Sequence, residues 1–156
     1  MNLNTAVDEI EKLWASLGKS TYPLKSNSKL WHSGIIDFGN TELSQDRVVW
    51  LTRDFSKSDY YNAWAKDEAK CRSISAYKLE LSCVNNLNLA EFNEHHHFHE
   101  ITKRYLDSQH TNLNKALNQF CIRNSIDGII RGDNLNEVAI LATNFQNLKL
   151  LAKVTL

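Results

Sequence analysis

The sequence has 156 residues, of which 42% are hydrophobic and 23% charged, as is usual for a globular protein of about one domain. A single proline and five glycines exclude a collagen-like chain or a Pro/Gly-rich linker. Eighteen basic residues balance eighteen acidic ones, which argues against a broad basic face for nucleic acid but leaves room for a local basic groove.

No apolar run approaches the roughly 20 residues of a membrane span. The N-terminal segment carries acids where a signal peptide needs positive charge. The three cysteines, Cys71, Cys83 and Cys121, are far apart and odd in number, so they support neither a disulfide framework nor a zinc ribbon. We therefore expect a cytoplasmic protein in a reducing compartment, with no membrane partner.

The first half of the chain mixes both periodicities. Apolar residues at helical spacing predict a helix over 5–17, and the polar stretch 19–28 with the only proline predicts a loop. A short strand is expected over 29–32 and a stronger one over 48–52, whose continuous VVWLT run is typical of a strand covered on both faces. Residues 34–47 between them have mostly turn chemistry.

The second half continues with a helix over 56–70, capped by Ser56 or Ser58, and an alternating strand over 73–82. The remaining expected elements are an extended segment over 84–92, helices over 95–123 with a break near 110–112, and strands over 126–130, 137–142 and 148–155. Regular βαβ alternation is absent, so the pattern favours an α+β fold with a mostly antiparallel sheet.

Two side chains stand out where strands begin or end. His32 lies at a strand end, where a histidine is usually structural or exposed. Glu137 is the first residue of the apolar run Glu-Val-Ala-Ile-Leu. A carboxylate at the start of a buried strand costs folding free energy unless it is paired with another group or serves a functional role. The alternative for Glu137 is a solvated strand end, and in either case we expect it to contribute little to folding.

The histidine tract 95–99 suggests a metal site, because His95 and His99 stand four residues apart and would share a helix face. No acid or cysteine is spaced to complete a recognised site. We therefore interpret the tract as a solvated helix start and expect no metal.

Three short motifs follow one another along the chain. The apolar run 30–34 reads Leu-Trp-His-Ser-Gly, and Trp50 is followed six residues later by Ser-Lys-Ser-Asp-Tyr-Tyr over 56–61. Asn-Glu then opens the apolar run 136–140, just after an Asp-Gly strand at 126–130. Taken singly, the hydroxyls and aromatics of the second motif fit a helix cap and core packing equally well.

Taken together, these motifs resemble the ADP-ribosyltransferase superfamily, in particular its His-Tyr-Glu branch typified by the catalytic domain of poly(ADP-ribose) polymerases. The chain departs from the family pattern at Ser33 and Val48, where the family prefers glycine, and at Trp50, where it has tyrosine. Trp50 keeps a stacking surface. The short chain, without an appended regulatory helical domain, resembles a small bacterial or phage mono-ADP-ribosyltransferase toxin or effector.

The resemblance implies a split β-sandwich of two small, mostly antiparallel sheets with flanking helices. It implies one catalytic domain over 1–156, with an N-terminal helix and loop at 1–28 and the catalytic core at 29–156. The substrate NAD⁺ would lie in a cleft between the two sheets.

The resemblance also assigns roles. The catalytic residues would be His32, which donates to a ribose hydroxyl, Tyr61, which stacks on nicotinamide, and Glu137, which holds the ribose 2′-hydroxyl and stabilises an oxocarbenium-like transition state. Ser58 and the backbone of Ser33 would bond the carboxamide. The expected NAD⁺-binding set is His32, Ser33, Gly34, Trp50, Thr52, Ser58 and Tyr61.

The resemblance favours transfer of ADP-ribose to a protein or nucleic acid, and a toxin of this kind is expected to have an antitoxin or immunity protein. An arginine acceptor is disfavoured, because Leu135 stands where such enzymes place a second acid. The alternatives are an NAD⁺ glycohydrolase, an RNA 2′-phosphotransferase, for which no dense Arg/His set lies near the motifs, and a catalytically inactive NAD or ADP-ribose binding module.

Overall fold

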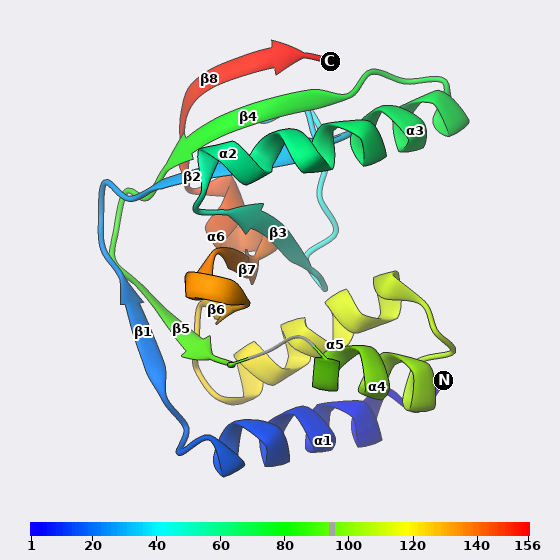
Figure 1. Cartoon of the computed structure of the whole chain (residues 1–156), viewed down its shortest axis with the longest axis vertical. Helices are drawn as coiled ribbons and strands as arrows, with labels where there is room; N and C mark the ends of the chain where they lie inside the picture. The colour runs from blue at the N-terminus through cyan, green and yellow to red at the C-terminus, as the bar shows by residue number, and fades with distance from the viewer. Residues whose placement is uncertain (94–95) are drawn as a thin grey trace.

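The computed structural model describes residues 1–93 and 96–156 (Figure 1). Its strands form one curled, eight-stranded sheet in the order β1-β5-β6-β7-β3-β2-β4-β8, and every neighbouring pair is antiparallel except β5 and β6. This confirms the α+β class and the mostly antiparallel sheet. The strands are β1 (Thr21–Leu24), β2 (Lys29–Gly34), β3 (Val48–Thr52), β4 (Tyr77–Ser82), β5 (Leu87–Glu91), β6 (Gly128–Arg131), β7 (Glu137–Leu141) and β8 (Lys149–Thr155).

The expected division into two separate sheets is wrong. Strands β2 and β3 remain joined through the pair Trp31↔Thr52, the one register pair between them in the described residues. Beyond this bridge they diverge, because Nδ1 of His32 bonds the backbone oxygen of Trp50 where the next ladder bond would form. The sheet therefore bends at this point without separating.

Helices cover the sheet on both sides. They are α1 (Leu3–Ser16), α2 (Phe55–Ser58), the 3₁₀ turn η1 (Asp59–Tyr61), α3 (Asn62–Arg72), α4 (His96–Tyr105), α5 (His110–Arg123), the turn η2 (Asp133–Leu135) and α6 (Ala142–Gln146). Helices α1, α4 and α5 gather at one end of the molecule, whereas α2 and α3 lie along β2 and β4 (Figure 1).

Strand β3 is buried on both faces, as its apolar run predicts. Val48 and Trp50 pack with α1, α4 and α5, whereas Val49 and Leu51 pack against α6 and the inner face of β2 and β4. Successive side chains of a strand alternate between faces, so one short run contributes to both apolar clusters. The helix over 5–17 and the strands over 29–32 and 48–52 are thus confirmed, with small changes at their ends.

Several boundaries differ from the sequence-based expectation. The expected loop 19–28 contains β1, an edge strand that pairs with β5 through residues such as Tyr22 and Leu89. The expected strand 73–82 begins only at Tyr77, after Ser73 adopts a left-handed conformation (φ 55°) at the end of α3. The break between the later helices falls at 106–109, slightly earlier than expected.

No helix within 1–93 or 96–156 is long and apolar enough to cross a membrane.

Candidate active site

Three polar side chains lie in register at the ends of neighbouring strands. Glu137, the first residue of β7, pairs with Thr52 of β3 on one side and with Arg131 of β6 on the other. Ile129 and Ala139, two residues further into the sheet, belong to the apolar cluster beneath α5. By alternation, the three polar residues share that face of the sheet and emerge where its apolar cover ends.

Both carboxylate oxygens of Glu137 are held. Nε of Arg131 donates to Oε2 at 2.9 Å, and the hydroxyl of Tyr61 donates to Oε1 at 3.1 Å. The Glu137 side chain is 30% exposed and that of Arg131 only 12%. Each carboxylate oxygen has a second lone pair, so Glu137 can still accept a bond from a ligand hydroxyl.

Arg131 is fixed from behind by aromatic rings. Its guanidinium carbon lies 4.1 Å from the centre of the Trp50 ring and 5.2 Å from that of Phe98. The indole of Trp50 is oriented in turn, since its Nε1 donates to Oδ1 of Asn114 at 2.8 Å, and it stacks on His110 with the ring centres 6.4 Å apart. Cation–π contacts and the ion pair together keep the guanidinium in one place.

His32 has a defined tautomer. Its Nδ1 lies 2.6 Å from the backbone oxygen of Trp50, and because a carbonyl can only accept, Nδ1 must carry the hydrogen. Burial lowers the pKa of His32, so the ring is neutral near pH 7 and Nε2 is an acceptor. At Gly34, a Cβ would lie 2.6 Å from this Nε2, so a larger residue would displace the pinned ring.

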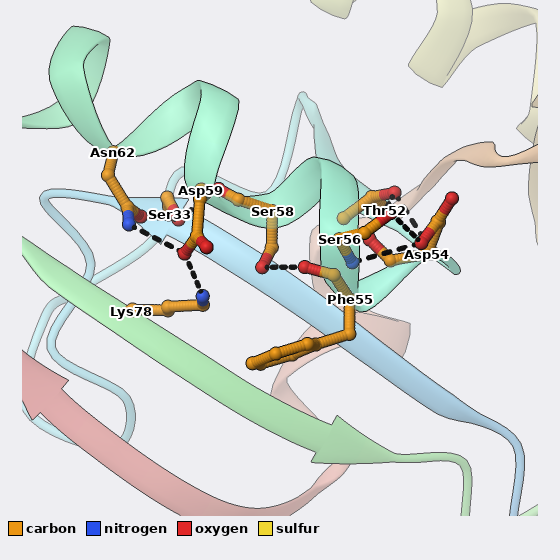
Figure 2. A network of polar contacts seen from close by, with 9 residues as sticks. All are labelled: Ser33, Thr52, Asp54, Phe55, Ser56, Ser58, Asp59, Asn62 and Lys78. Carbon is orange, nitrogen blue, oxygen red and sulfur yellow. Dashed lines mark hydrogen bonds and ion pairs between the residues drawn. The ribbon is translucent and has the colours of Figure 1, made fainter.

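The second motif forms the start of the helical segment on the other side of the site (Figure 2). The cap expected from Ser56 or Ser58 is instead Asp54, whose Oδ1 accepts from the backbone nitrogen of Ser56 at 2.9 Å. Asp59 is held by Nζ of Lys78 at 2.6 Å. These bonds set the direction of the helix that carries Tyr61.

The two serines expected near a carboxamide already have partners within the protein. Ser58 is buried and its hydroxyl donates to the backbone oxygen of Phe55 at 2.6 Å, as Figure 2 shows. The hydroxyl of Ser33 donates to Oδ1 of Asn62 at 2.7 Å. The Ser33 bond fixes β2 against α3, whereas the Ser58 bond stays within α2.

These elements enclose a cavity of about 250 Å³. We refer to it as the central cavity. Every residue of the expected NAD⁺-binding set except Gly34 lines it, together with Glu137. The lining residues are Trp31, His32, Ser33, Trp50, Leu51, Thr52, Ser58, Tyr61, Trp64, His110, Arg131 and Glu137. Three motifs separated by up to about a hundred residues of sequence therefore converge on one concave site.

Tyr61 is the neutral donor of the site. Burial, followed by the negative charge and hydrogen bond of Glu137, raises the pKa of Tyr61 to about 12. The phenol therefore stays protonated at neutral pH and keeps donating to the carboxylate. The central cavity thus combines an aromatic wall, a neutral histidine acceptor and an oriented carboxylate.

Sequence reasoning missed Arg131, His110 and Asn114. Arg131 had a signal that could have found it, because a hairpin between the expected strands 126–130 and 137–142 can place it opposite Glu137. His110 and Asn114 come from α5, which nothing in the sequence connects to this face.

The histidine tract was the candidate for a metal site. His95, one half of the candidate metal pair, lies outside the described residues, and His99 is exposed on α4. Within the parts of the chain that the structure describes, no three His, Cys, Asp or Glu side chains gather as metal ligands would.

Comparison with known proteins places the fold. No protein-family model matches the sequence, and no curated protein does so either. Among solved structures, the crystal structure of the MbcT–MbcA toxin–antitoxin complex of M. tuberculosis contains a similar chain, with a TM-score of 0.54 and 10% sequence identity. The similarity covers 97% of this chain and 91% of the other, so the two share their overall fold along nearly the whole length.

Proposed function

We propose that this chain is an NAD⁺-dependent mono-ADP-ribosyltransferase of the His-Tyr-Glu type that acts as a toxin or effector. The observation that carries the proposal is the convergence of His32, Tyr61 and Glu137 on the central cavity, with both oxygens of Glu137 held in place. The three residues come from motifs that lie far apart in the sequence, and they line the same cavity.

The reaction would break the bond between nicotinamide nitrogen and the ribose C1′. The electron pair leaves with nicotinamide as a neutral product, and positive charge develops on the ribose. Glu137, fixed beside the ring, accepts the 2′-hydroxyl and stabilises that charge from a preorganised position. An acceptor hydroxyl, amine or ring nitrogen then bonds to C1′ and releases its proton, for which the Glu137 carboxylate can serve as the base.

His32 would take a different part from the one expected. Its Nδ1 hydrogen is committed to the Trp50 backbone oxygen, so Nε2 accepts from a ribose hydroxyl instead of donating to it. Tyr61 supplies the ring on which nicotinamide stacks. The hydroxyl of Ser58 is turned to its own helix, so the backbone around Ser33 is the stronger candidate for the carboxamide.

The toxin part of the proposal has separate support. The similar chain belongs to a toxin–antitoxin complex, and its likeness extends over 97% of this chain. We propose accordingly that residues 1–156 form one catalytic domain and that a protein antitoxin binds it.

A glycohydrolase is the second candidate, favoured by one observation. Glu137 and Tyr61 also line a recess of about 410 Å³ that His32 does not line, together with Lys57, Asp133 and Asn136. Water as well as a macromolecular acceptor can approach Glu137 from there. An inactive binding module remains the alternative from another class, and it predicts binding of NAD⁺ without release of nicotinamide.

One experiment separates these functions. The protein is incubated with NAD⁺ labelled in its adenylate part, with and without cell lysate, and the products are digested separately with protease and nuclease. Label in a macromolecule that protease or nuclease destroys identifies a transferase and its acceptor class. Release of free ADP-ribose in both samples, with no labelled macromolecule in the lysate, identifies a glycohydrolase, and unchanged NAD⁺ in both samples contradicts the proposal.

A further inference from the structure

A second cavity, of about 460 Å³, adjoins the central cavity between α4 and α5. We refer to it as the α4–α5 cavity. Arg131 and His110 line both cavities and form the wall between them. His99 and Lys103, from successive turns of α4, line the far side.

The α4–α5 cavity has a one-sided charge. Of the described residues that line it, Lys103 and Arg131 are cationic, His99 and His110 are imidazoles, and none carries a carboxylate. The nearest acid in the connecting loop is Asp107, and its carboxylate binds the amino group of Met1 at 3.2 Å, outside the cavity. Arg131 is already paired with Glu137 at 2.9 Å, so the positive charge that this cavity offers a ligand is mainly that of Lys103, which no acid in the lining opposes.

The other recess beside Glu137 has the opposite character. Its one basic side chain, Lys57, stands against the two acids Asp133 and Glu137. A group with two negative charges would be repelled there and attracted to the α4–α5 cavity. The central cavity itself, at about 250 Å³, is smaller than the sites of roughly 300–1,000 Å³ that usually enclose a drug-sized ligand.

We propose that the α4–α5 cavity is the diphosphate subsite of a dinucleotide that extends across the Arg131–His110 wall. Nicotinamide and its ribose occupy the central cavity, and the ADP half passes over the wall to Lys103 and His99. This proposal rests on the proposed function, and it deepens it by assigning the substrate's anionic half to residues outside the three motifs. It makes Lys103 a determinant of affinity for any ligand that carries a nucleoside diphosphate.

The test uses ADP as the probe and titration calorimetry as the readout. Lys103 is exposed, so Lys103→Gln should fold normally. We expect ADP to bind the wild type and to bind Lys103→Gln about tenfold more weakly, as loss of a charge-assisted bond predicts. Lys103→Arg should retain most of the affinity for ADP. The matched control is Lys149→Gln on exposed β8, which should bind ADP as the wild type does.

In NAD⁺ cleavage, Lys103→Gln should raise KM by a similar factor and leave kcat unchanged.

Equal ADP affinity of the wild type and Lys103→Gln would overturn the subsite, and so would a wild type that binds NAD⁺ but not ADP. Failure of the proposed function gives a different result. In that case the wild type releases no nicotinamide, yet ADP still binds in a Lys103-dependent way, and the α4–α5 cavity stands as a nucleoside-diphosphate site.

Discussion

Nε of Arg131 lies 2.9 Å from Oε2 of Glu137, across the hairpin that joins β6 to β7. The two residues are direct cross-strand partners, and the guanidinium is stacked on Trp50 behind them. The catalytic carboxylate of the proposed mechanism therefore has its orientation set by the sheet register and by an aromatic ring, and not by solvent. This relationship makes Arg131 a positioning residue for Glu137.

Replacing Arg131 by lysine should expose this role. Lysine keeps the charge but lacks the planar fork and the flat surface that stacks on Trp50. We expect kcat for NAD⁺ cleavage to fall about tenfold and the free energy of unfolding to fall by about 1–2 kcal/mol. The matched control is Arg123→Lys on α5, whose guanidinium pairs with Asp8 at the surface. Equal kcat in both variants would remove Arg131 from the mechanism.

Tyr61→Phe separates stacking from hydrogen bonding. The variant keeps the ring but removes the hydroxyl that donates to Oε1 of Glu137. We expect the Kd for NAD⁺ to change by less than about threefold, whereas kcat should fall roughly tenfold, because a bond to a charged group is lost. Tyr60→Phe, one residue earlier on the exposed side, should behave as the wild type. A weaker Kd with unchanged kcat would instead assign the hydroxyl to binding.

His32 should make stability depend on pH. Burial lowers the pKa of His32 in the folded state. Below about pH 6.5, therefore, the His32 ring takes up a proton in the unfolded chain but stays neutral in the folded protein. Stability is therefore complete above this pH and decreases as the pH falls, with a slope of at most about 1.4 kcal/mol per pH unit for this one proton.

Urea unfolding between pH 7.5 and 5 measures this slope. His32→Gln should be less stable at pH 7.5 but lose less on acidification than the wild type. His99→Gln, at an exposed position, should keep the wild-type slope. Parallel pH profiles of stability for wild type and His32→Gln would show that His32 does not cause the pH dependence.

The sequence predicted most of the fold because the strongest elements carry their own periodicity. The run VVWLT of β3 needs cover on both faces, and the structure provides it. The edge strand β1 was missed because Tyr22 and Pro23 show no alternation and depend on pairing with β5. The junction of the two expected sheets depends on one bridge, Trp31↔Thr52, and no local pattern encodes such a contact.

The residues of the candidate site that belong to sequence motifs could be predicted. Those that reach the site only through tertiary packing could not. His32, Tyr61 and Glu137 were identified from the sequence, and the structure brings them to one cavity. The residues that orient these three side chains were not identified from the sequence. Asn114, which fixes Trp50, belongs to α5, and the tautomer of His32 follows from a backbone oxygen that no sequence pattern specifies.

Glu137→Gln tests the central claim most directly. Glutamine keeps an oxygen for Arg131 but removes the charge that pairs with a guanidinium only 12% exposed. The free energy of unfolding should therefore fall by about 1–2 kcal/mol, more than its place at a strand mouth suggests, while the protein remains folded. NAD⁺ should still bind through Tyr61 and His32.

The decisive quantity is the rate of nicotinamide release from NAD⁺ by folded wild type and by folded Glu137→Gln at saturating NAD⁺. The wild type should release nicotinamide, and the variant should do so at least about a hundredfold more slowly, because the preorganised negative charge facing the developing oxocarbenium ion is gone. Expression of the wild type should likewise arrest growth, whereas the variant accumulates. A Glu137→Gln protein that binds NAD⁺ and releases nicotinamide at the wild-type rate would contradict the proposed mechanism.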